Sequence, residues 1–133
     1  MTLVDTSVWI DFLEGRSHWS KERLKEKINQ RASIGYTEMI LLEIIQGIHQ
    51  KTGRIQIEEQ FRHFVLLPHK RSTSLLAADI YQVLQRKGIR IRSIVDCLIA
   101  ATAIETGTTI LHKDRDFGHI AEHYPIICEK EEN

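Results

Sequence analysis

Four acidic side chains are the strongest candidates for chemistry in this sequence. Asp5 and Asp114 each follow a short apolar run, Asp96 is the third residue after Ser93, and Glu43 interrupts a long apolar stretch. Three of them have ordinary structural explanations: Asp5 and Asp114 could cap a helix or a turn. Ser93 and Asp96 have the spacing of a capping box, in which both residues only serve a helix start.

Glu43 is harder to explain by local structure alone. Its expected helical neighbours include Met39 and Ile40, and no Lys or Arg follows on that helix before Lys51. A carboxylate within an apolar helix costs free energy unless a positive group meets it. A polar stripe at the surface is the alternative, but we favour a functional role for Glu43.

Considered together, the four acids predict a metal site. Asp5, Asp96 and Asp114 lie where a strand hands over to a helix or where a helix begins, and Glu43 can project inward from a neighbouring helix. Carboxylates that meet in one cleft repel each other unless a counter-charge is present. Mg²⁺ and Mn²⁺ prefer oxygen ligands and can promote hydrolysis of a phosphodiester bond.

The elements that position these acids alternate between short β-rich runs and helices, which predicts an α/β fold with a parallel sheet covered on both faces. Ligands of such sheets bind at the carboxyl ends of the strands, where the acids are expected. The predicted strands are residues 2–4, 32–36, 65–68, 108–111 and 125–128. The predicted helices are residues 8–13, 19–30, 37–49, 55–64, 72–87, 94–105 and 117–122. Thr6 and Ser7 are expected to cap the first helix, and Thr52-Gly53 is expected to break the chain between the third and the fourth. Residues 129–132 are expected to form a frayed end.

Length and composition favour one domain, residues 1–133, in a soluble cytoplasmic protein. The chain has 18 Lys and Arg against 18 Asp and Glu, a net charge of +0, and 42% hydrophobic residues. These values are typical of a globular domain and argue against coating of nucleic acid by bulk charge. No apolar run could span a membrane, no secretory signal is present, and Cys97 and Cys128 have no metal-site spacing.

Four segments resemble the PIN domain family and, within it, the VapC-type toxins of bacterial toxin–antitoxin pairs. The resemblance covers nearly the whole chain, and the order and spacing of the segments make it specific. The segments are LVDTSVWID at residues 3–11, LEIIQG at 42–47, DCLIAATA at 96–103 and LHKDRDF at 111–117.

The resemblance implies a three-layer α/β/α fold and Mg²⁺- or Mn²⁺-dependent endoribonuclease activity on structured RNA, frequently tRNA, which arrests translation. It assigns the catalytic acidic quartet to Asp5, Glu43, Asp96 and Asp114, all of them also metal ligands. Asp116 is a neighbouring acid that shares in metal binding. Thr6 and Ser7 match hydroxyls that orient the first acid. The implied partners are a VapB-type antitoxin, whose basic tail lies across the acids, and a second copy of the chain in a homodimer.

Basic residues beside the acids are candidates for RNA contact. Arg90 and Arg92 belong to the most basic run, which leads into the helix of Asp96, and Lys113 and Arg115 flank Asp114. Phosphate contacts position a nucleic acid without reading its sequence. The alternative to RNA contact is that the basic run forms a solvated surface and that Lys113 and Arg115 pair with the neighbouring acids.

A non-catalytic α/β module whose acidic cleft receives a basic partner segment is the alternative function. RNA cleavage that depends on added metal would distinguish the nuclease from the module. A phosphoacceptor domain is a more distant third, because Thr6 stands where an adjacent second acid is expected.

Overall fold

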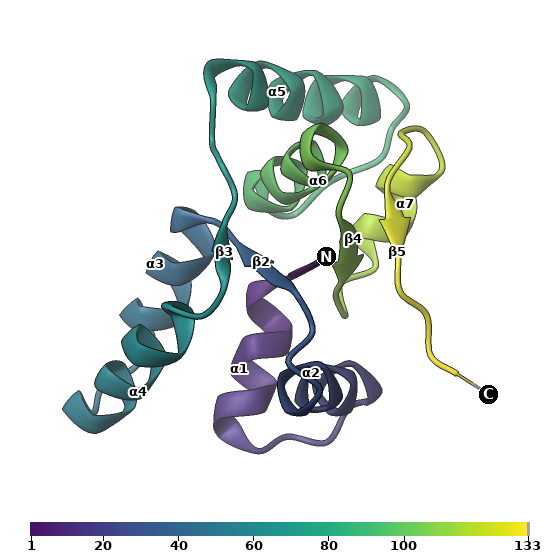
Figure 1. Cartoon of the computed structure of the whole chain (residues 1–133). Coiled ribbons are helices and arrows are strands. Elements are labelled where there is room, and N and C mark those ends of the chain that lie inside the picture. The colour runs from purple at the N-terminus through teal and green to yellow at the C-terminus, as the bar shows by residue number, and fades with distance from the viewer. Residues whose placement is uncertain (133) are drawn as a thin grey trace.

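The computed structural model describes residues 1–132 and shows an α/β fold, as predicted. Within these residues seven helices flank a five-stranded parallel sheet of order β3-β2-β1-β4-β5 (Figure 1). The strands are β1 (Thr2–Val4), β2 (Ile34–Tyr36), β3 (Val65–Leu66), β4 (Thr109–Leu111) and β5 (Ile127–Cys128). The helices are α1 (Thr6–Glu14), α2 (Trp19–Asn29), α3 (Glu38–Gln46), α4 (Lys51–Phe61), α5 (Arg71–Arg86), α6 (Ile94–Thr106) and α7 (Asp116–Ala121).

The register of the two central strands brings the first and last acids to one edge of the sheet. Val4 at the end of β1 pairs with Leu111 at the end of β4. The backbone N–H of Asp5 then donates to the carbonyl of Leu111 over 2.9 Å. Asp5 and the loop after β4 therefore leave the sheet side by side, as expected for carboxyl ends of neighbouring parallel strands.

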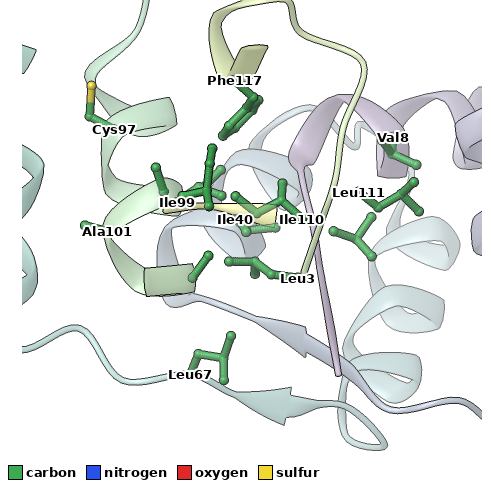
Figure 2. Packing of buried hydrophobic residues seen from close by; sticks show 14 of the residues in the cluster. Leu3, Val8, Ile40, Leu67, Cys97, Ile99, Ala101, Ile110, Leu111 and Phe117 are labelled. Atoms are coloured by element: carbon green, nitrogen blue, oxygen red, sulfur yellow. The ribbon is translucent and has the colours of Figure 1, made fainter. Parts of the chain in front are cut away.

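Two layers of helices cover the sheet and bury its apolar strands. In Figure 1, α5 and α6 lie on one side of the sheet and α1 and α2 on the other. Figure 2 shows Leu3 of β1, Ile110 of β4 and Ile99 of α6 in the same cluster of buried side chains. Trp9 of α1 is fully buried, with its ring 4.9 Å from that of Phe61.

Helix ends follow their local signals in most places. Thr37 accepts from the backbone N–H of Ile40 over 3.2 Å and caps α3, as predicted. Gly15 and Gly107 have φ values of 70° and 67° and end α1 and α6 in the left-handed conformation that favours glycine. None of the helices in residues 1–132 combines the length and apolar character needed to cross a bilayer.

Two of the predicted helix boundaries are wrong. Thr52 and Gly53 do not break the chain but lie in the first turn of α4, and α3 ends at Gln46 rather than at residue 49. A glycine costs a helix only about 1 kcal/mol. Burial of Ile57 and Phe61 on α4 offsets that cost, because most helix stability in proteins comes from tertiary packing.

The predicted frayed end is also wrong where it begins. Glu129 pairs with Nη1 of Arg23 at 2.9 Å and with Nζ of Lys27 at 3.1 Å. The cations of α2 at these two positions are therefore not simply a solvated face, because they hold the segment after β5 against α2.

Candidate active site

Three aspartates converge at the carboxyl end of the sheet. Asp96 lies in the first turn of α6, Asp114 in the loop after β4, and Asp116 at the start of α7. One carboxylate oxygen from each lies within 4.8 Å of the others. Asp114 and Asp116 thus meet Asp96 from a separate part of the sequence, and we define these three residues as the acidic cluster.

Asp5 and Glu43 are not among the three acids that meet within 4.8 Å, although the charge of Asp5 acts on Asp96 and that of Glu43 acts on Asp5. Two hydroxyls hold these two acids. Asp5 caps α1 by accepting from the backbone N–H of Ser7 at 3.3 Å and from its hydroxyl at 2.5 Å. The hydroxyl of Thr6 donates to Glu43 Oε1 over 2.8 Å. The cap of α1 is therefore Asp5 rather than Thr6 and Ser7. Ser7 binds the first acid as predicted, whereas Thr6 orients Glu43 instead.

The capping-box explanation of Asp96 is wrong. Ser93 caps α6 by accepting from the backbone N–H of Val95 at 3.2 Å. The carboxylate of Asp96 does not return to the backbone of Ser93: within residues 1–132, its Oδ2 is buried without a hydrogen-bond partner. A buried carboxylate oxygen without a donor is costly, so the position calls for a proton or a cation.

Burial and neighbouring charges disfavour ionisation at Asp96 and Asp5. Burial raises the pKa of Asp96 to about 8, and the charges of the other acids, Asp5 first among them, act in the same direction. Burial also raises the pKa of Asp5, with a smaller upward effect from Glu43, although the hydrogen bonds from Ser7 oppose the shift. These shifts are those of carboxyls that lack an adequate counter-charge.

Asp114 behaves in the opposite way. Its partial burial alone would raise the pKa of its carboxyl. Three interactions outweigh burial and lower the pKa: the hydrogen bond from the backbone N–H of Asp116, at 2.9 Å from Asp114 Oδ1, and the contacts with Asp96 and Arg92. The pKa values of the two neighbouring carboxyls are therefore shifted in opposite directions, upward for Asp96 and downward for Asp114.

The donor set fits a hard divalent cation. The cluster offers carboxylate oxygens, and sulfur and imidazole donors are absent from it. Mg²⁺ and Mn²⁺ prefer such oxygens and would supply the charge that the buried Asp96 oxygen lacks. His112 is not one of the three residues whose ligand atoms meet there: its ring lies 4.7 Å from that of Phe117, and burial lowers the pKa of its imidazole.

The four basic candidates differ in what they contact. Arg92 meets the acidic cluster, with its Nη2 3.3 Å from Asp114 Oδ1 and its backbone N–H donating to Asp116 over 3.1 Å. Lys113 Nζ lies 2.5 Å from Asp11, so Lys113 pairs with an acid, which is the alternative stated for it above. Arg90 and Arg115 are exposed.

Asp11 is the important residue that the sequence interpretation missed as part of the site. It is an acid in the apolar stretch of α1, between Trp9 and Phe12, and only 1% of its surface is exposed. Glu43 is likewise an acid within an apolar helical stretch, so the same criterion would have identified Asp11.

Known proteins of one family match this chain. The family model described as PIN domain matches residues 2–123. VapC ribonuclease Mb1587 from Mycobacterium bovis and Ribonuclease VapC11 from Mycobacterium tuberculosis are each 32% identical over 123 residues, which is 91% of this chain and 92% of theirs. Among solved structures, VapBC2 from Rickettsia felis, bound to a DNA fragment from its promoter, has a TM-score of 0.74 at 16% identity, with 96% of both chains covered. Mycobacterium tuberculosis VapC20, described as a sarcin-ricin loop cleaving toxin, has a TM-score of 0.63 at 20% identity, with 93% of this chain and 96% of the other covered.

The solved structures show that the chain shares their fold. The assignment to a family rests on the family model and on the relatives with higher sequence identity. Both extend over about nine-tenths of the chain, and the family-model match at residues 2–123 includes the four segments that hold Asp5, Glu43, Asp96 and Asp114. The chain therefore belongs to the PIN domain family and, within it, to the VapC type.

Proposed function

We propose that this protein is a Mg²⁺- or Mn²⁺-dependent endoribonuclease that acts as the toxin of a toxin–antitoxin pair in the cytoplasm. The observation that carries the proposal is the acidic cluster, whose Asp96 has a buried oxygen with no partner in residues 1–132 and a pKa of about 8. Membership of the VapC type supports ribonuclease chemistry at this cluster.

In the proposed mechanism, four aspartates would hold the metal: Asp5, Asp96, Asp114 and Asp116. A bound divalent cation would stabilise charge developing on the phosphate oxygens and make water a better nucleophile. Glu43, fixed by the Thr6 hydroxyl, completes the set of acids and orients the attacking water. Its carboxylate can accept a proton from that water.

The proposed substrate is a structured RNA such as tRNA, whose cleavage would arrest translation. Arg90, Arg92 and Arg115 are exposed and would contact its backbone. The proposed partners are a VapB-type antitoxin and a second copy of the chain. The solved VapBC complexes from Rickettsia felis and Haemophilus influenzae support the antitoxin proposal, because this chain has their fold.

Removal of the metal should abolish cleavage. Purified protein incubated with a tRNA pool is expected to cut RNA in Mn²⁺ or Mg²⁺ and to lose activity in excess EDTA, with recovery when Mn²⁺ is restored. Gel electrophoresis of end-labelled RNA measures the result. Cleavage that persists in EDTA would contradict the metal-dependent proposal, and an absence of cleavage in either metal would favour the non-catalytic module.

Replacement of Arg92 by Gln should tighten metal binding. The Arg92 guanidinium neutralises Asp114 and lies 3.9 Å from Asp116, so it competes with a cation for the same carboxylates. Since an exposed ion pair is worth about 0.4–1 kcal/mol when its geometry is favourable, the dissociation constant for Mn²⁺ should fall about 2- to 5-fold in isothermal titration calorimetry.

Arg90→Gln is the matched control, because it removes the same charge from an exposed side chain two residues away. Its affinity for Mn²⁺ should stay close to that of the wild type. Equal affinities for the two variants would show that Arg92 does not compete with the metal.

A further inference from the structure

Asp11 and Lys113 form an ion pair close to the acids but outside the acidic cluster. Asp11 Oδ2 and Lys113 Nζ are 2.5 Å apart, and the Asp11 side chain is almost fully buried, whereas 31% of the Lys113 side chain is exposed. A buried carboxylate with a single cationic partner is strongly dependent on that partner, since its loss leaves an uncompensated charge.

The pair joins two segments that carry the proposed metal ligands. Asp11 lies on α1, whose N-terminus carries Asp5, and Lys113 immediately precedes Asp114. Within residues 1–132, this pair is the only hydrogen bond or ion pair between the side chains of α1 and residues 112–116. The strands hold the backbone at Leu111, but the loop that follows depends on the pair for its connection to α1.

The other polar side-chain contacts described for residues 112–116 are within the loop or with the segment before α6, and none of them reaches a side chain of α1. Asp114 accepts from the backbone of Asp116 at 2.9 Å, and Asp116 accepts from the backbone of Arg92 at 3.1 Å. These bonds order the loop against itself and against the segment before α6. Acids facing each other across this gap repel, so a link is needed to keep α1 and the loop together before a cation arrives.

We propose that the Asp11–Lys113 pair is a positioning element that sets the distance between Asp5 on α1 and Asp114 in the loop after β4. Neither residue touches the metal or the RNA: each acts through the segment that carries it. The inference rests on the proposed metal-dependent function. Groups that orient metal ligands from behind typically contribute 10- to 100-fold to metal affinity.

Calorimetric titration with Mn²⁺, in the absence of RNA, tests the inference on the full chain. Asp11→Asn and Lys113→Met should each weaken Mn²⁺ binding about 10-fold. The double variant should be no weaker than the weaker single variant, because either substitution already breaks the link. Lys113→Met retains an unbranched side chain of similar length at a partly exposed position, so it provides a second test should Asp11→Asn fold poorly.

Glu129→Gln is the matched control for a purely structural effect. It breaks the pairs with Arg23 and Lys27, which are also partly buried, between α2 and the segment after β5. It should lower the melting temperature without changing the affinity for Mn²⁺ by more than about 2-fold.

The outcomes separate the inference from the proposed function. Wild-type affinity in Asp11→Asn and Lys113→Met would overturn the inference and leave the metal-dependent nuclease intact. Equal weakening in Glu129→Gln would also overturn it, because the loss would then follow from stability alone. Failure of the wild type to bind Mn²⁺ would overturn both.

Discussion

Asp96→Asn is expected to abolish RNA cleavage while it preserves the fold. Mutation of groups that only support metal ligands already costs about 10- to 100-fold, so the loss of a central ligand should cost about 1,000-fold or more. The amide is nearly isosteric with the carboxyl and cannot carry the charge that neighbouring acids disfavour. Rates of cleavage of a fixed RNA at saturating Mn²⁺ provide the measurement, and circular dichroism checks the fold.

Asp79→Asn controls for the chemical change itself. Asp79 lies exposed on α5, outside the acidic cluster, and its variant should cleave RNA at the wild-type rate. If the Asp96→Asn variant cleaves RNA at the wild-type rate, the catalytic site must lie elsewhere in the molecule.

The metal-free protein is expected to lose stability as the pH rises from about 6.5 to 8.5. Asp96 has a pKa of about 8 in the folded protein, against an ordinary value of 3.8. Between pH 3.8 and pH 8 the folded protein therefore binds more protons than the unfolded chain, and it loses stability relative to the unfolded chain as the pH rises through this range. With allowance for water around the carboxyl, the loss is about 1–2 kcal/mol, or roughly 5 °C in melting temperature. Thermal denaturation in EDTA across this interval measures it.

The Asp96→Asn variant separates Asp96 from the other groups, including Asp5, whose pKa burial also raises and which acts in the same direction. His112, whose pKa is lowered by burial, affects stability mainly below about pH 6.5, and Cys97, whose pKa burial raises to about 12, acts only above about pH 9. Asp96→Asn should flatten the curve and raise the melting temperature of the metal-free protein at the upper end. A melting temperature of the wild type that does not change across this interval would contradict the raised pKa of Asp96. Added Mn²⁺ should stabilise the wild type most at high pH, because there it no longer competes with a proton for the carboxylate.

Much of the fold could be predicted because its signals are local. Short apolar runs at residues 2–4 and 109–111 became adjacent parallel strands, and Thr37 and Ser93 capped the helices that follow them. The wrong boundaries, such as the break expected at Gly53, arose where packing of a helix overrode a weak local preference. The ion pairs of Glu129 with α2 could not be predicted, since they join residues about 100 positions apart.

For the site, the sequence identified the acids but not their partners. Asp5, Glu43, Asp96 and Asp114 were predicted from their residue types and from their places at strand ends or in an apolar helix, and their catalytic roles remain predictions. The structure draws Asp116 into the acidic cluster, assigns the Thr6 hydroxyl to Glu43 and pairs Lys113, a candidate RNA contact, with Asp11.

Residue types and local patterns were enough to predict the alternation of strands and helices, the single edge at which the acids gather and the class of chemistry they can perform. These follow from hydrophobic period, capping residues and the oxygen preference of hard cations, all of which depend on neighbouring residues or on residue type. Three further properties became visible once the chain was folded: which acids have raised pKa values, which cation lies against the cluster and which buried acid of α1 pairs with the loop after β4. They depend on burial and on distances of a few ångströms between residues far apart in the chain, and no local pattern encodes them.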